Sequence, residues 1–206
     1  MLVKNKYVIK EHAKLLSSRK TYDIIDPDTT DVVATAEQKT TLMANLIGMV
    51  LGPPATAIEI RAKGSGDLLF TVRRRGLLFK KVEVLDGTGK VIGLYKAKRL
   101  SLSGGFHVYN DAGKHIAEIR GKLLKSEYRF FTPDGKTEMG AVSKKWGGMA
   151  KELFTSADTY GVEVRPEFAE DAEVKIMILG AAIAADALLG GKGGSGGGGD
   201  SGGDDE

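Results

Sequence analysis

The sequence predicts a mainly β protein, a closed antiparallel β-barrel of about twelve strands around a central C-terminal α-helix. Two observations support this fold class. Short alternating apolar runs, separated by turns rich in Asp, Gly and Asn, occupy residues 22–164. Residues 176–185 then form an apolar run, which is typical of a helix buried on every side. A closed barrel accounts for both observations, because it leaves no free sheet edge and encloses the helix.

The strands are separated by turns in which Asp, Asn and Gly tolerate left-handed backbone and Pro presets the first turn angle. These turns lie at residues 26–31, 63–67, 86–89, 110–113 and 132–135. The last three recur at intervals of roughly 23–25 residues, as expected for an antiparallel meander. We add an N-terminal strand at Tyr7–Ile9 and a final strand at Thr159–Val164, which brings the total to about twelve.

Two helices are expected among these strands. Residues 41–51 pair apolar side chains at helical spacing, and Gly52-Pro53-Pro54 ends the segment. The second helix begins near Asp171, because acidic side chains suit the positive end of the helix dipole, and it runs to about Leu189. Its uninterrupted apolar run, residues 176–185, is much shorter than the roughly 20 residues that cross a bilayer. We therefore expect a core helix and not a membrane span.

Composition divides the chain into a folded domain, residues 1–189, and a tail, residues 190–206. The tail is rich in Gly and has no apolar side chain to bury, so we expect it to be disordered. It contains one Lys and four acidic residues, so the chain's net charge of +3 corresponds to +6 on the domain. This charge favours anionic partners.

The chain has no Cys, which excludes disulfides, thiolate metal sites, a Cys nucleophile and S-palmitoylation. The first ten residues lack an apolar signal core, so we expect a cytoplasmic protein, at most peripherally membrane-associated, and not a secreted one. No Ser/His/Asp arrangement or carboxylate pair in a recognisable context indicates hydrolytic chemistry. We therefore do not expect an enzyme.

A family resemblance lies in the segment from Lys144 to Leu189. The only Trp stands in a Trp-Gly-Gly turn, an apolar helix ends the segment, and two short motifs lie between them, Glu152-Leu153-Phe154-Thr155 and Ala157-Asp158-Thr159-Tyr160-Gly161-Val162. In this order the segment resembles the C-terminal end of the phospholipid scramblase family. That family shares its fold with tubby C-terminal domains and plant LURP-one-related proteins. The resemblance implies a twelve-stranded barrel around one helix, and a protein that acts at or binds phospholipid membranes, including bidirectional transbilayer lipid movement.

The resemblance also implies a calcium loop that starts at the acidic strand. The candidate ligands are Asp158, Glu163, Glu167 and Asp171. Calcium takes about six to eight oxygen ligands, and the residues directly after Asp158 offer no carboxylate and no EF-hand spacing. A solvated acidic loop is the alternative interpretation of these residues.

A basic run is the candidate site for phosphate or anionic phospholipid headgroups. It consists of Arg73, Arg74, Arg75, Lys80 and Lys81. Each cation near an anionic bilayer contributes about 1 kcal/mol of attraction, so a membrane surface is the expected partner of this run. The alternative is an ordinary solvated face. Nucleic acid is not expected as a partner, because no ladder of stacking aromatic residues accompanies the cations.

Two His residues lie on opposite arms of one predicted hairpin, where His107 and His115 are expected to be close together. Two His without a third ligand make a poor metal site, so the sequence predicts none there.

Two functions remain open from the sequence. The first is a scramblase-related protein at phospholipid membranes. The alternative is a soluble tubby-like or LURP-one-like module that binds phosphoinositides or a protein partner without transport.

Overall fold

A computed structural model describes residues 2–12, 20–39, 56–74, 81–97, 105–122, 127–144 and 159–185. The helix predicted at residues 41–51, the Trp-Gly-Gly turn and the tail lie outside these ranges.

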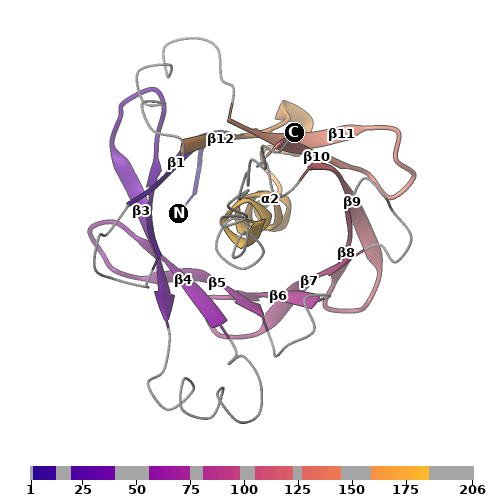
Figure 1. The fold of residues 1–206 in the computed structure, drawn as a ribbon, viewed down its shortest axis with the longest axis horizontal. Coiled ribbons are helices and arrows are strands. Elements are labelled where there is room, and N and C mark those ends of the chain that lie inside the picture. The colour runs from indigo at the N-terminus through magenta and orange to yellow at the C-terminus, as the bar shows by residue number, and fades with distance from the viewer. Residues whose placement is uncertain are drawn as a thin grey trace, which may run out of the picture.

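The described strands form one closed antiparallel barrel, as the sequence predicts (Figure 1). Each strand pairs with its neighbours in the chain, and β1 closes the ring by pairing with both β2 and β12. The strands are β1 (Lys6–Glu11), β2 (Thr21–Ile25), β3 (Val32–Lys39), β4 (Thr56–Ala62), β5 (Leu68–Arg74), β6 (Lys81–Asp86), β7 (Val91–Ala97), β8 (Phe106–Asn110), β9 (His115–Lys122), β10 (Glu127–Phe131), β11 (Glu138–Ser143) and β12 (Thr159–Val164). A 3₁₀ helix, η3 (Pro166–Phe168), and the helix α2 (Ala172–Ala184) follow.

The five predicted turns all lie at one end of the barrel, which we call the turn end. Their polar side chains hold the backbone: in the β6–β7 turn, Asp86 Oδ1 accepts hydrogen bonds from the backbone nitrogens of Thr88 and Lys90, at 2.9 and 3.0 Å. Gly89, at a φ of 88°, supplies the left-handed residue that this turn needs. Because the strands alternate in direction, residues 2–5 and the start of α2 lie at this same end.

Helix α2 lies inside the barrel (Figure 1). It begins at Asp171, whose Oδ1 accepts hydrogen bonds from the backbone nitrogens of Glu173 and Val174, at 3.0 and 3.1 Å. From Met177 to Ala185 every residue is buried, and the helix packs against β5, β6, β7, β11 and β12. This arrangement confirms the predicted core helix, and no helix in the described ranges has the length and apolar content needed to span a bilayer.

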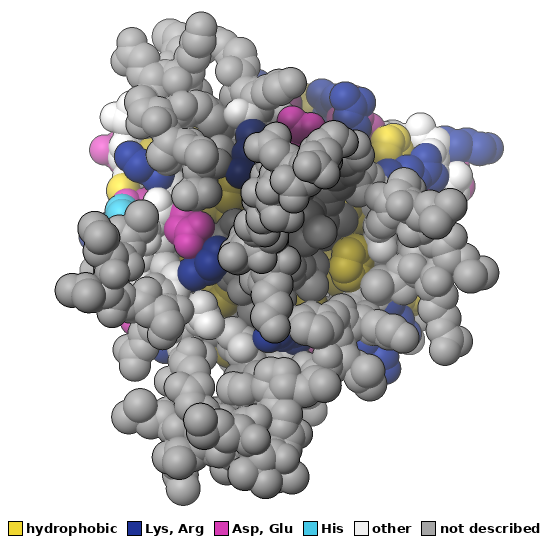
Figure 2. All heavy atoms as spheres, in the orientation of Figure 1, with side chains coloured by type: hydrophobic (Ala, Val, Ile, Leu, Met, Phe, Trp, Pro, Cys, Tyr) yellow, Lys and Arg dark blue, Asp and Glu magenta, His cyan; other side chains and the backbone are white. Residues whose placement is uncertain are grey.

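The strand residues alternate between the barrel interior and the outer surface, as the pleat of a β-strand requires. In β5, for example, Phe70 and Val72 are fully buried against the helix side. On the face seen in Figure 2, Lys and Arg side chains lie at several separate places, close to Asp and Glu side chains. The charged residues of this face are therefore mixed in sign.

Candidate functional site

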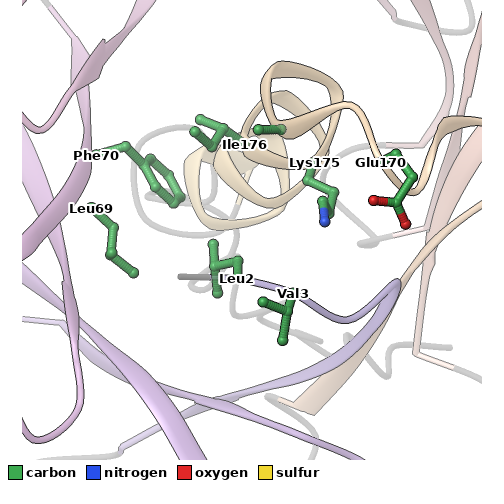
Figure 3. A pocket seen from close by; sticks show the side chains of 8 residues that line it. Leu2, Val3, Leu69, Phe70, Glu170, Lys175 and Ile176 are labelled. Atoms are coloured by element: carbon green, nitrogen blue, oxygen red, sulfur yellow. The ribbon is translucent and has the colours of Figure 1, made fainter.

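A cavity of about 380 Å³ opens at the turn end of the barrel, between α2 and the wall. Three segments that are distant in sequence form it: the residues before β1, the start of β5 and the first turn of α2 (Figure 3). They meet because all three lie at the turn end. The lining residues are Leu2, Val3, Leu69, Phe70, Glu170, Ala172, Lys175 and Ile176.

Most of the cavity wall is apolar. The Leu2 side chain points between Leu69 and Ile176, and the Phe70 ring closes the side formed by β5 (Figure 3). At the rim Val3 is 74% exposed, and it is the only large hydrophobic residue in the described ranges that is exposed to this degree. Apolar walls with few polar groups are typical of ligand pockets, which measure about 300–1,000 Å³.

Lys175 is the main polar group of the cavity. The residue is only 7% exposed, and its amine points along the cavity on the side of Val3 and Glu170 (Figure 3). Within the described ranges, its side chain takes part in no hydrogen bond or ion pair. The amine is accessible from the cavity, and its apolar surroundings offer it little compensation, so an anionic ligand group in this cavity would be stabilising.

Two further charges act on the cavity. The positive end of the α2 dipole lies at the turn that carries Lys175, and it favours anions. Glu170, which is exposed at the rim, opposes them and is suited to an ammonium group. The cavity therefore offers an inner positive site, an outer negative site and an apolar wall.

The predicted basic run does not form one surface in the structure. Arg73 lies on the outer face of β5, where its Nη2 and Nε donate hydrogen bonds to Glu83 Oε2 at 2.7 and 2.9 Å. The next residue, Arg74, is in phase with the inward side of the strand, and desolvation lowers the pKa of its guanidinium. Consecutive strand residues face opposite sides, which separates the two arginines.

Lys81 is the third described member of the run. It is exposed on β6 and pairs in register with Lys96 of β7, which places two cations side by side on the outer face. Arg75 and Lys80 lie outside the described residues.

The candidate calcium ligands are spread over several elements. Glu163, on β12, forms an ion pair with Lys6 at 3.4 Å. Glu167 is exposed in η3, and Asp171 caps α2 through its own carboxylate. These three do not by themselves make a cluster of metal-ligand atoms among the described residues. Asp158 lies outside the described ranges, so calcium binding stays a prediction.

Sequence reasoning missed the cavity and Lys175. The signal was present, because Lys175 is the only cation in the helix and directly precedes the apolar run Ile176 to Ala185. The contribution of Leu2 and Val3 was not predicted, because these residues precede the first expected strand and their position beside α2 depends on the tertiary structure.

Comparison with known proteins identifies the family. A sequence model of the family described as Scramblase matches residues 70–189, more than half of the chain. The chain is 38% identical over 87 residues to "Phospholipid scramblase 2" of Bos taurus, a match that covers 39% of this chain and 29% of that protein. It is 25% identical over 113 residues to "Phospholipid scramblase family member 5" of Homo sapiens, covering 52% of this chain and 41% of that protein. The matches thus span less than half of either relative's length.

A solved structure shows a more distant likeness. The X-ray structure of an Arabidopsis thaliana protein aligns with a TM-score of 0.46 at 11% identity, over 86% of this chain and 96% of that chain. This likeness is too low to inform the function. The family match covers most of β5, β6 to β12 and α2, including Phe70, Glu170 and Lys175 of the cavity. The chain therefore belongs to the scramblase family.

Proposed function

We propose that this scramblase-family chain binds anionic phospholipids at a membrane surface, with the headgroup held in the cavity at the turn end. In this proposal the Lys175 amine binds the headgroup phosphate. The glycerol and first methylene groups contact the apolar wall formed by Leu2, Leu69 and Phe70.

The observation that carries the proposal is Lys175, a buried residue whose amine faces an apolar cavity. An ammonium–phosphate pair shielded from water is stronger than one on the surface, because the attraction between charges increases where the local dielectric constant is low. Hydrogen bonds to charged groups contribute about 1.5–3 kcal/mol. The ligand must therefore combine an anionic group with an apolar body. A phospholipid does so, and it is the ligand class named by both relatives.

The rim residue Glu170 refines the choice of headgroup. Its carboxylate is suited to the ammonium group of phosphatidylserine, which carries a net negative charge and an amine. Phosphatidylglycerol has the same net charge and no amine. We therefore expect phosphatidylserine to bind more tightly than phosphatidylglycerol.

Long-range attraction comes from the charge of the folded domain, +6 over residues 1–189, with Lys81 and Lys96 adjacent on the outer face. Screening limits this attraction to about 8 Å at physiological salt, so the surface contribution falls as salt rises. The shielded contact at Lys175 is expected to resist salt better.

The size of the cavity limits the proposal to binding. At about 380 Å³ it is at the small end of ligand pockets and holds a headgroup, not a complete two-chain lipid. The barrel interior beyond it is filled by α2, where Leu179 and Ile183 are fully buried. Within the described ranges, the filled interior leaves no path for a lipid through the barrel. We therefore propose that this cavity binds the headgroup and does not itself conduct lipid.

Sedimentation with vesicles tests this function. Full-length protein is mixed with vesicles of phosphatidylcholine alone or with added phosphatidylserine, across a salt series, with calcium or with a chelator. Lys175→Met removes the amine and keeps the length of the side chain. Lys114→Met is the matched control, because Lys114 is an exposed cation in the β8–β9 turn at the same end of the barrel.

We expect binding to phosphatidylserine vesicles that Lys175→Met weakens several-fold more than Lys114→Met. An equal loss of vesicle binding in the two variants would show that binding depends only on the net positive charge, and it would refute the role of the cavity. If the wild type does not bind any vesicle, membrane binding is refuted and the soluble-module alternative is favoured. Binding only with calcium would support the acidic ligands predicted around Glu167.

A further inference from the structure

Three potential metal ligands meet on the outer face of the barrel, away from the cavity. His107 lies on β8, and His115 and Glu118 lie on β9. His107 Nδ1 and His115 Nε2 are 3.2 Å apart, and His107 Nδ1 is 3.8 Å from Glu118 Oε1. One ligand atom from each of the three lies within 4.8 Å of the others, and they form the only such group in the described ranges.

A β-bulge brings these side chains together. Tyr109 pairs with His115 and Val108 pairs with Ala117, so Ile116 is an extra residue on β9. In a regular strand, positions three residues apart face opposite sides, and His115 would point away from Glu118. The extra residue turns His115 to the outer face, where Glu118 already pairs with His107. Bulges that redirect a side chain are common beside functional sites.

We propose that His107, His115 and Glu118 form a three-ligand site for a divalent transition-metal ion of the zinc class, with the fourth position open to solvent. Zinc binds His nitrogen at about 2.0–2.1 Å in tetrahedral geometry, so two ligand atoms of one site are about 3.3–3.4 Å apart. The nitrogen–nitrogen distance of 3.2 Å is close to this value. Glu118 Oε1 lies 3.8 Å from His107 Nδ1, and a small rotation of the Glu118 side chain would bring it to the distance expected between two ligands of one zinc ion.

The two ring nitrogens face each other. In the metal-free protein a hydrogen bond joins His107 Nδ1 and His115 Nε2, and the ring tautomers decide which nitrogen donates. A metal ion requires both nitrogens to be deprotonated, so it would displace that hydrogen and accept a lone pair from each ring. Two imidazoles favour zinc, copper or nickel over calcium, which prefers oxygen ligands.

Neighbouring residues hold the ligands in place. Arg120 donates hydrogen bonds to Glu118 Oε2 from Nε and Nη2, at 3.2 and 3.1 Å, which leaves Oε1 directed at His107. The Tyr109 ring lies 5.4 Å from the His115 ring and 6.3 Å from the His107 ring, centroid to centroid. Outer residues that orient metal ligands in this way typically change metal affinity by about 10–100-fold.

Two cations oppose the metal. Arg120 is bound to the carboxylate, and Lys96, which pairs in register with His107, places its Nζ 4.3 Å from the centroid of the Tyr109 ring. Both charges lower the affinity for a divalent ion. The partial exposure of the ligands, 34% for the His107 side chain and 16% for that of Glu118, leaves solvent to complete the coordination.

Titration of the full-length, tag-free protein with Zn²⁺ by calorimetry tests this site, and Co²⁺ supplies a spectroscopic test because tetrahedral Co²⁺ absorbs strongly in the visible range. The variants are His115→Gln and Glu118→Gln. The chain has three His residues, so His12→Gln is a matched control. His12 also contacts a carboxylate, with its Nε2 2.7 Å from Asp23 Oδ2, but it lacks a second imidazole.

We expect one Zn²⁺ per chain, a tetrahedral Co²⁺ spectrum, and a higher melting temperature with Zn²⁺. His115→Gln should weaken Zn²⁺ binding at least about tenfold and abolish the Co²⁺ spectrum, and Glu118→Gln should weaken binding less. His12→Gln should leave both unchanged. Circular dichroism confirms the fold of each variant, and His107→Gln replaces any variant that does not fold.

Two results would overturn the site. One is the absence of saturable Zn²⁺ binding by the wild type. The other is binding that His115→Gln and His107→Gln both leave intact, which would locate the ion elsewhere, such as at the acidic tail that all variants retain. Neither result bears on lipid binding, because the cavity at Lys175 and this outer site share no residue.

Discussion

The Tyr95 hydroxyl donates a hydrogen bond of 2.6 Å to the backbone carbonyl of Met177, deep inside the barrel. This bond joins the wall, at β7, to the central helix α2, across 82 residues of sequence. Tyr95 is almost fully buried, and desolvation raises the pKa of its phenol well above the ordinary value of 10.0. The hydroxyl therefore remains protonated at neutral pH and keeps its donor role there.

Tyr95→Phe is expected to lower the free energy of unfolding by about 1 kcal/mol, because it removes this hydrogen bond and little volume. Urea denaturation measures the change. Tyr109→Phe is the control, since Tyr109 lies on the outer face and its ring contacts Lys96 and the two histidines. Equal stability of Tyr95→Phe and wild type would contradict the helix position described here.

At Gly180 the helix α2 packs closely against the wall. A Cβ atom at this position would lie 2.9 Å from Tyr95 Oη and 3.4 Å from Val72 Cγ2. Gly180→Leu is expected to cost about 1–3 kcal/mol or more through overpacking, although leucine has the higher helix propensity. Thermal denaturation measures this loss, and an unchanged melting temperature would refute the central-helix arrangement.

The contact between Gly180 and Tyr95 also predicts coupling. Gly180→Ala should be less destabilising in a Tyr95→Phe background, because the oxygen that the new methyl group meets is gone. Additive effects in this double-mutant cycle would show that the two residues do not touch.

Exposed carboxylates in the turns predict loss of stability in acid. The Thr88 hydroxyl lowers the pKa of Asp86, the Lys90 ammonium lowers that of Asp111, and the Thr132 hydroxyl lowers that of Asp134. Because the folded-state pKa is depressed, the contribution of each group is complete above the ordinary value of 3.8 and is lost as the pH falls through the folded-state pKa.

This effect is measured as the difference in unfolding free energy between wild type and Asp86→Ala at several pH values. The difference is expected to be constant above about pH 5 and to shrink as the pH falls below the ordinary carboxyl pKa. The difference for Tyr95→Phe should not change in that range, because the phenol does not titrate there. A difference for Asp86→Ala that is independent of pH would contradict the role of the turn carboxylate.

The barrel was predictable because its signals are local. Turn residues such as Asp86 and Gly89 specify hairpins, and consecutive hairpins can pair only with their neighbours in an antiparallel meander. The buried helix was readable for a similar reason, since Ile176–Ala185 is apolar on every side. Barrel closure by β1 and β12 followed from the need to cover the helix and the sheet edges.

The sites were less predictable, because they depend on where neighbouring elements place each side chain. The cations Arg73 and Arg74 are consecutive in sequence, but the pleat of β5 directs them to opposite faces of the strand. Lys175 was not predicted as a site residue, because a single Lys next to an apolar run does not indicate a cavity. The two histidines were expected to be close, and they are. Glu118 pairs in register with His107, and His115 joins these two only through a bulge at Ile116, which has no signature in one sequence.

The binding of a short-chain, monomeric phosphatidylserine to the full-length protein tests most directly whether the cavity is a headgroup site. Dihexanoyl phosphatidylserine below its micelle concentration removes the membrane surface, so only a defined pocket gives saturable binding. We expect one lipid per chain and an affinity at least about tenfold lower in Lys175→Met, which corresponds to about 1.4 kcal/mol for the lost ammonium–phosphate contact. Lys114→Met should bind like the wild type. No saturable binding, or equal affinity in wild type and Lys175→Met, would contradict the assignment of this cavity.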